Sequence, residues 1–311
     1  MVFQHKLGSL GEKTTRVTAL SSALAKQLGY DTDLAARAAL LSKADLVTDM
    51  VGEFASLQGV IGRYYAIENG EPRAVAAAIE EQYLPKLSGG PLPSSETGQV
   101  LALADKLDTL VGVFSVGLLP TGDKDPFALR RASLGILRII IENNLNLDLN
   151  ALITLSCEQF THAFDTNSTQ PLVLNFMLDR LKGYCLNKGF SAEHIAAVAS
   201  INCSEPVDFM NRIQAVQDFS ALPEAASLSE ANKRIQNLLK KAPANISDQL
   251  NADLLSDAAE TELYQQLLRC ESQAQASIKH QQYIAALKAL SSLKEPIDAF
   301  FEHVFIMVDD E

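Results

Sequence analysis

The sequence contains no tryptophan, only four cysteines and five histidines, and no long hydrophobic run among its 311 residues. The cysteines are far apart and form no CxxC pair, which disfavours a zinc knuckle or a disulfide framework. The most apolar stretch, "LGILRIII" (134–141), is short and interrupted by Arg138, and the first residues, "MVFQHKLGSL", lack the apolar core of a secretion signal. These absences predict a cytoplasmic protein with reduced thiols and no membrane partner.

Acidic residues outnumber basic ones by 38 to 26, which gives a formal net charge of −12. Such a balance argues against broad electrostatic binding to nucleic acid, and no DNA partner is expected. The charge is uneven, because residues 242–311 contain twelve Asp and Glu against four Lys and Arg, a net of −8. A basic face must therefore be sought locally.

Helical periodicity runs through nearly the whole chain, without a convincing alternating β pattern. The sequence therefore predicts an all-α protein. Clusters of Gly, Pro and Ser predict breaks between helices, at residues 87–98, 118–126, 168–172, 204–206, 221–229 and 294–296. They suggest three blocks, with boundaries near residues 145 and 220.

Two helices of the first block carry paired carboxylates. "RAALLSKADLVTDMV" (37–51) and "LALADKLDTLVG" (101–112) place Asp45 with Asp49, and Asp105 with Asp108, at spacings that share a helical face. The two pairs could form one acidic site. The alternative is that the carboxylates cap turns and pair with Lys and Arg.

A third helix of this block combines an apolar face with arginines. In "DKDPFALRRASLGILRIII" (123–141), Asp125 is expected to cap the helix and Pro126 to occupy its first position. The arginines Arg130, Arg131 and Arg138 fall on the apolar face or its border. A guanidinium near a core needs an acidic partner, and the candidates are Asp45, Asp105, Asp108 and Asp123. Alternatively, the arginines bind phosphates of RNA.

The third block contains a helix with a basic face, "LSEANKRIQNLLKK" (228–241). Its apolar face is expected to comprise Leu228, Ala231, Ile235, Leu238 and Leu239. The opposite face carries Lys233, Arg234, Asn237, Lys240 and Lys241. This face is either simply solvated or a contact for RNA phosphates, with Asn237 nearest a base. The last helix, "PIDAFFEHVFIMV" (296–308), repeats apolar residues at helical spacing, Phe305 and Val308 included, and is expected to belong to the core.

The helices "AALL..D" and "ADKLD" resemble those of the HD-domain fold, in which a His-Asp pair, further histidines and a late aspartate hold metal for phosphoester hydrolysis. Asp105 matches the late aspartate, but Lys43, Ala44 and Asp45 stand where the His-Asp pair would be. His5 is the only histidine of the block, and oxygen ligands alone would suit Mg²⁺ rather than a transition metal. We therefore expect a degenerate HD site, comprising Lys43, Asp45, Asp105 and Asp108, with no metal and no catalytic residue.

A longer resemblance covers the chain from end to end. "LLSKADLVTDMVGEFASLQGVIGRYYA", "TGDKDPFALRRASLGILRIIIENNLNLDL", "EPVDFMNRIQAV", "EANKRIQNLLKK" and "KEPIDAFFEHVFIMVDDE" are similar to the β subunit of bacterial glycyl-tRNA synthetase. The resemblance implies an HD-like domain over 1–145, a helical linker over 146–220, and a DALR-type anticodon-binding domain over 221–311. Family members have a long portion before the HD-like domain and a closing helix after "VDDE". The chain is therefore expected to be part of a longer subunit, with its last domain incomplete at the C-terminus.

The resemblance also implies a function. In this family the α subunit activates glycine with ATP and Mg²⁺ in an α2β2 assembly, so this chain would act as a subunit of a glycine–tRNA ligase. It would bind tRNA(Gly) and hold no cofactor itself. The expected tRNA contacts are Lys233, Arg234, Asn237, Lys240, Arg130 and Arg131. The alternatives are an HD-type metal-dependent phosphohydrolase and a helical interaction scaffold.

Overall fold

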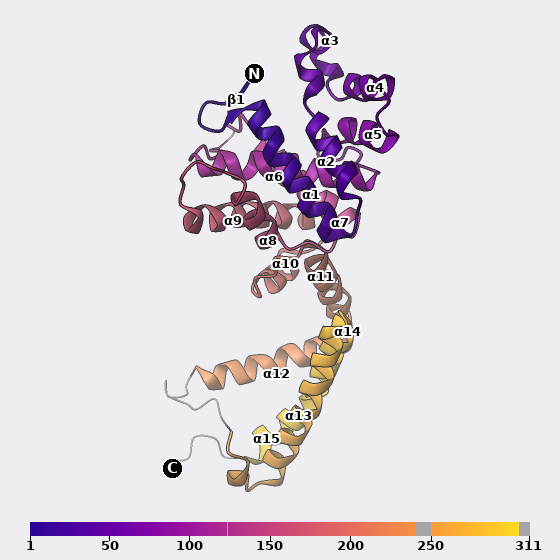
Figure 1. The fold of residues 1–311 in the computed structure, drawn as a ribbon. Helices are drawn as coiled ribbons and strands as arrows, with labels where there is room; N and C mark the ends of the chain where they lie inside the picture. Colours follow the sequence, from indigo (N-terminus) through magenta and orange to yellow (C-terminus); the bar gives the residue numbers. More distant parts are fainter. Residues whose placement is uncertain (123, 241–249, 305–311) are drawn as a thin grey trace. The chain divides into compact units, whose positions relative to one another are not determined.

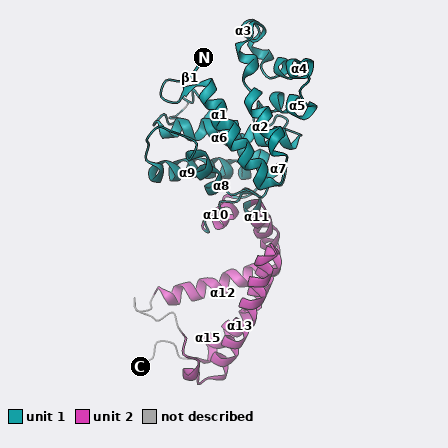
Figure 2. Ribbon diagram, viewed as in Figure 1, with its two compact units in different colours: residues 1–191, 201–209 teal, residues 192–200, 210–311 magenta. Residues whose placement is uncertain are grey.

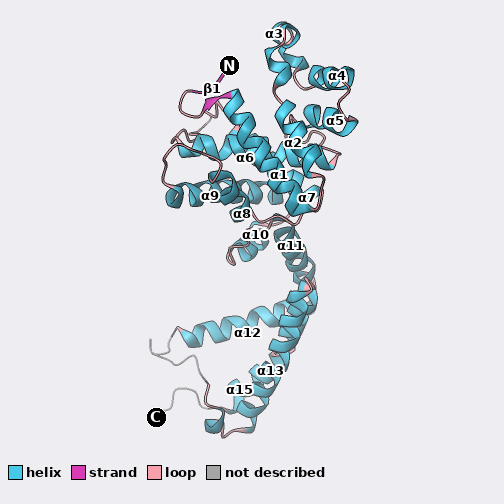
Figure 3. Ribbon diagram, in the orientation of Figure 1, coloured by secondary structure: helices cyan, strands magenta, loops and turns pink. Residues whose placement is uncertain are grey.

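The computed structural model describes residues 1–122, 124–240 and 250–304, and within these ranges nearly all regular secondary structure is helical, as predicted (Figures 1 and 3). It divides into two compact units (Figure 2). Unit 1 contains Met1–Ser191 and Ile201–Phe209, and unit 2 contains Ala192–Ser200 and Met210–Glu311. Block 146–220 is shared between the units, and its role as a separate linker domain stays a prediction. No helix of the described ranges is long and apolar enough to cross a membrane.

Unit 1 begins with a two-stranded antiparallel hairpin in which Val2 pairs with Ser9 and Gln4 with Gly8, a small departure from the all-helical prediction. Its elements are β1 (Val2–Gln4), β2 (Gly8–Ser9), α1 (Leu10–Leu28), α2 (Thr32–Leu41), η1 (Ala44–Val47), α3 (Asp49–Glu53), η2 (Ala55–Leu57), α4 (Val60–Glu68), α5 (Arg73–Glu81), α6 (Glu96–Ser115), α7 (Leu129–Glu142), α8 (Leu149–Cys157) and α9 (Thr166–Asn187).

Helix α6 forms the centre of unit 1. Almost every residue from Thr97 to Phe114 is buried, and α6 packs against α1, α2, α5, α7, α8 and α9. A helix that is apolar on nearly all sides must be covered on nearly all sides. The few polar residues of α6 between Asp105 and Thr109 therefore have to find partners inside the unit.

Helix α7 begins later than the sequence predicted. Its first residue is Leu129, and Ala128 before it adopts a left-handed conformation with φ of 52°. The expected start at Asp125 and Pro126 is therefore wrong. The Asp125 carboxylate nevertheless accepts hydrogen bonds from the backbone amides of Leu129 (2.8 Å) and Arg130 (3.0 Å). A turn closed by the amide of Ala128 and the carbonyl of Asp125 separates the aspartate from the helix it caps.

Helix α9 crosses the break predicted at 168–172 and contains Pro171. A proline removes one backbone donor, and here it does so near the start of the helix. The Asp165 carboxylate accepts from the amides of Asn167 (3.0 Å) and Ser168 (3.4 Å), and the Thr169 hydroxyl donates to the Asp165 carbonyl (2.7 Å). These bonds hold the first turns, so the helix tolerates the proline.

Unit 2 contains α10 (Ala192–Ala199), most of α11 (Pro206–Ser220), α12 (Pro223–Leu239), η3 (Ala252–Leu254), α13 (Ala258–Lys279), α14 (Tyr283–Ser291) and α15 (Lys294–His303). Two expected breaks are present but are shorter or earlier than predicted, at 221–222 and 292–293, because Pro223 starts α12 and Pro296 lies in the first turn of α15. Proline is tolerated at both places, since first-turn amides have no helical acceptor.

The core of unit 2 is small. Ala231 and Ile235 of α12 pack with Cys270 of α13. The same cluster contains Leu293, which precedes α15, and Ile297, which lies in α15. The prediction that α15 is a core helix is confirmed for Ile297, whereas Phe305 and Val308 lie outside the described residues. Leu239 was expected on the apolar face of α12, but it is 55% exposed, because the buried face ends before the last residue of the helix.

Candidate functional site

Asp105 and Asp108 of α6 lie at the centre of a buried ion-pair network, and Lys13 of α1 joins them. The Lys13 ammonium lies 3.2 Å from Asp105 Oδ1 and 3.0 Å from Asp108 Oδ2. It also donates to the Thr109 hydroxyl at 2.8 Å. Asp108 is fully buried and Lys13 is 3% exposed. Each of these buried charges is therefore stabilised by the other.

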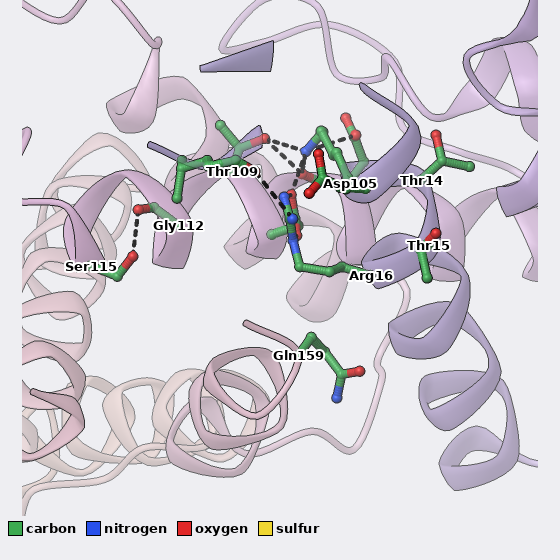
Figure 4. A network of polar contacts seen from close by, with 12 residues as sticks. Thr14, Thr15, Arg16, Asp105, Thr109, Gly112, Ser115 and Gln159 are labelled. Atoms are coloured by element: carbon green, nitrogen blue, oxygen red, sulfur yellow. Dashed lines mark hydrogen bonds and ion pairs between the residues drawn. The ribbon is translucent and has the colours of Figure 1, made fainter. Parts of the chain in front are cut away.

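Arg16 lies one turn along α1 from Lys13 and holds Asp108 with two nitrogens. Its Nε lies 2.5 Å from Asp108 Oδ1, and its Nη2 lies 3.2 Å from Oδ2. The guanidinium also lies over the ring of Phe160, 4.6 Å from its centroid. Figure 4 shows Arg16 beside Asp105 and Thr109 in this network. The two-pronged contact fixes the orientation of α1 on α6.

Lys43 approaches Asp105 from the turn between α2 and η1. Its ammonium lies 3.0 Å from Asp105 Oδ1 and donates to Gln82 Oε1 at 2.6 Å. The amide of Gln82 in turn donates to the carbonyls of Ser42 and Ile79, both at 2.7 Å. These hydrogen bonds fix the side chain of Gln82, and Gln82 in turn holds the Lys43 ammonium beside Asp105.

Asp45 has a different role from the one the sequence suggested. Its Oδ2 accepts a hydrogen bond from the backbone amide of Gly59 at 2.6 Å, and the residue is 3% exposed. Asp49 is exposed and lies in α3, whereas Asp45 lies in η1. The expectation that the two share one helical face is wrong, because the chain changes direction at Thr48.

These contacts leave the degenerate HD site unsuited to a metal. Burial alone would raise the pKa of Asp105, but the ammonium groups of Lys13, Lys43 and Lys106 outweigh it and hold the pKa well below its usual range. The ionised carboxylate thus already has two cations at contact distance. Among the described residues no three His, Cys, Asp or Glu side chains gather as a metal would require. The residues present do not fit a bound metal ion.

The expected pairing of Arg130 or Arg131 with Asp45, Asp105 or Asp108 is wrong, because other cations hold Asp105 and Asp108. Arg130 donates to the carbonyl of Gly122 at 2.5 Å, and Arg131 is exposed. Neither makes an ion pair with another residue of the described ranges, and Asp123 lies outside them.

Arg138, the third arginine of α7, is 8% exposed and pairs with Glu142 at 2.7 Å. It also donates to the carbonyls of Ser88 and Gly90, at 2.7 and 3.0 Å. These contacts attach the loop that precedes α6 to helix α7. Arg138 is therefore a structural residue.

A pocket of about 700 Å³ opens beside Asp105. The lining includes Asp105, Lys106, Lys86 and Arg131, together with the aromatic side chains of Tyr83 and Phe127. Lys106 donates to the backbone carbonyl of Gln82 at 2.9 Å. Burial lowers the pKa of Lys106 to about 8, against the attraction of Asp105 and with help from Lys43 and Lys13.

Lys13, Arg16 and Lys106 were not among the residues that the sequence singled out. One signal for Lys13 is visible in the sequence, because Lys13, Val17, Leu20 and Leu24 follow one another at the spacing of a buried helical face. A lysine on such a face needs a carboxylate nearby.

The basic face of α12 is divided in the structure. Lys233, Asn237 and Lys240 are exposed and follow the spacing i, i+4, i+7, so they form one row. Arg234 points elsewhere, since its Nη1 lies 2.6 Å from Asp298 and its guanidinium lies 4.5 Å from the ring centroid of Phe301. Arg234 therefore helps to hold α12 on α15. Lys241, the fifth residue of the predicted face, lies outside the described residues.

The described chain is thus a helical protein in which two lysines pair with Asp105, the residue that matches the late aspartate of the HD fold, and a second unit carries a separate basic row. It belongs to the glycyl-tRNA synthetase beta subunit family, whose family model matches residues 1–200. A second family model, described as a DALR anticodon binding domain, matches residues 228–311. The family predicted from the sequence is confirmed.

Curated relatives agree over the whole chain. A glycine–tRNA ligase beta subunit of Janthinobacterium sp. (strain Marseille) is 47% identical over 310 residues, which is 100% of this chain and 44% of the relative. The corresponding subunit of Ectopseudomonas mendocina (strain ymp) is 46% identical over 310 residues, 100% of this chain and 45% of the relative. The chain therefore spans less than half the length of the curated relatives it matches.

Proposed function

We propose that this chain is the tRNA-binding portion of the β subunit of a glycine–tRNA ligase, and that it supports the ATP-dependent attachment of glycine to tRNA(Gly). The observation that carries the proposal is the match of an anticodon-binding family model to residues 228–311, where α12 exposes a basic row. In this proposal glycine activation, with its ATP and Mg²⁺, takes place on the α subunit of an α2β2 enzyme in the cytoplasm. This chain itself holds no cofactor.

The basic row suits an anticodon arm. Lys233 and Lys240 make no ion pair with another described residue, so their charges are available to phosphates. The two lysines are seven positions apart along the chain, which in a helix is a rise of roughly 10 Å. Asn237 lies between them and can donate to and accept from an unstacked base. The excess of acidic residues in 242–311 disfavours RNA on other faces of the unit.

Fluorescence anisotropy with labelled tRNA(Gly) at several salt concentrations tests the proposal. Lys233→Ala/Lys240→Ala should weaken binding and lower the salt slope by about 0.7 to 0.9 for each lost contact. Asn237→Ala should instead change discrimination between anticodons. The control is Arg269→Ala/Lys279→Ala, which removes the same charge from exposed positions of α13. Equal affinities and slopes for the two double variants would refute the role of α12.

A further inference from the structure

We propose that the pocket beside Asp105 binds a phosphate group, independently of the basic row on α12. The pocket has a volume of about 700 Å³, which lies within the range of small-molecule sites. Its lining carries the cations Lys86, Lys106 and Arg131 against the single carboxylate of Asp105. In a chain with a net charge of −12, this is a local excess of positive charge.

The negative charge of Asp105 does not neutralise these three cations, because Asp105 already pairs with two other lysines. Lys13 and Lys43 lie 3.2 and 3.0 Å from Asp105 Oδ1, and both approach from outside the pocket lining. The charge that remains in the lining is therefore that of the three cations. A phosphate entering the pocket would meet cations that no other carboxylate of the described lining neutralises.

The three cations also have unused donors. Lys106 makes one hydrogen bond, to the Gln82 carbonyl, although an ammonium has three donors. Lys86 and Arg131 are exposed, and neither forms an ion pair with a described residue. Because all three line the same pocket, one phosphate with its several acceptor oxygens could engage them together.

Helix α7 leaves room for the half-buried side chain of Lys106. A Cβ added at Gly135 of α7 would lie 3.1 Å from Cε and 3.3 Å from Cδ of Lys106. The glycine therefore lets the lysine stem pass between α6 and α7 to reach the pocket. Tyr83 also lines the pocket, and its buried hydroxyl has no hydrogen-bond partner among the described residues.

The phosphate can come from a free nucleotide or from the backbone of RNA. Calorimetric titration of the chain with inorganic phosphate and with AMP tests the first source, and tRNA(Gly) anisotropy over a salt series tests the second. The main variant is Lys86→Ala/Arg131→Ala, which changes exposed side chains and should not disturb folding. The control is Lys26→Ala/Lys182→Ala, which removes the same charge elsewhere on unit 1. Lys106→Met keeps the apolar stem of the side chain and removes its charge.

The proposal expects the main variant and Lys106→Met to lose about tenfold in affinity for each lost contact, whereas the control stays within about twofold of the parent. Loss with phosphate or AMP identifies a free ligand as the source. Loss with tRNA alone, together with a shallower salt slope, identifies the RNA backbone. Equal affinity of the main variant and the control for all three probes overturns the proposal. If the parent binds phosphate but no tRNA, the proposed function fails and the pocket stands.

Discussion

Replacing Asp108 by asparagine should destabilise unit 1 strongly. Asp108 has no exposed surface and receives Lys13 at 3.0 Å and Arg16 at 2.5 Å. Asparagine has nearly the same size, but it removes the charge and leaves two cations with too few carboxylates. Asp105 cannot compensate, because it already pairs with Lys13 and Lys43.

Removing one member of a buried ion pair costs about 3 to 5 kcal/mol, because the partner's charge stays buried. Unit 1 contains 200 residues, a size at which 1 kcal/mol lowers the melting temperature by about 2 to 4 °C. Asp108→Asn should therefore lower it by about 6 to 20 °C. The exposed pair of Lys182 and Asp179, 3.2 Å apart, provides the comparison, since such pairs contribute only about 0.2 to 1 kcal/mol.

Far-UV circular dichroism is the suitable assay, because the chain has no tryptophan and is mostly helical. The two units need not melt together, so Asp108→Asn should shift only the transition that belongs to unit 1. Asp179→Asn should leave both transitions in place. A shift for Asp108→Asn that matches the Asp179→Asn control would show that water reaches the network and that apolar contacts alone hold α1 on α6.

Three further outcomes follow from particular contacts. Gly62→Ala should lower the free energy of unfolding by about 1 to 3 kcal/mol in a denaturant titration, since its Cβ would lie 2.7 Å from Ile79 Cγ2; Gly52→Ala, with open space around it, should not. Lys106 has a pKa of about 8 in the folded chain and about 10.4 when unfolded, so the unfolded chain binds more protons between these values. Burial is the main cause of this lowered pKa, opposed by Asp105 and assisted by Lys43 and Lys13, so the stability of the chain should rise with pH across that window, and Lys106→Met should lack the rise. Arg234→Ala should lower the stability of unit 2 in thermal melts by about 1 kcal/mol, a modest loss because the Asp298 pair is partly exposed, while Lys233→Ala should leave it unchanged.

The presence of helices could be predicted from hydrophobic periodicity, but the residues at which some helices begin could not. The expected starts relied on Pro126 and on a break around Pro171. In the structure Ala128 turns the chain before α7, and capping by Asp165 carries α9 through its proline. Both differences depend on which donor or acceptor a side chain reaches, and the sequence pattern does not contain that information.

The site was predicted in part for a similar reason. Asp105 and Asp108 lie on α6, whose sequence is apolar on nearly all sides, so their need for partners could be expected from the sequence. Their partners did not, because Lys13 is 95 residues from Asp108 and periodicity carries no information across that distance. The nearby arginines of α7 were the natural candidates, yet the later start of α7 leaves Arg131 at the pocket and Arg130 on Gly122.

A lysine ammonium and a divalent metal ion both satisfy a buried carboxylate, but they leave different chemistry behind. A metal ion can hold a water molecule and lower its pKa, whereas an ammonium can only donate hydrogen bonds. The ammonium groups of Lys13 and Lys43 on Asp105 can attract an anion by charge and hydrogen bonds, but they cannot lower the pKa of a bound water as a metal ion does. Replacing Lys43 by histidine would add one imidazole beside one carboxylate. Catalytic zinc sites use three protein ligands, and the other carboxylate at this place, that of Asp108, is already held by Lys13 and Arg16.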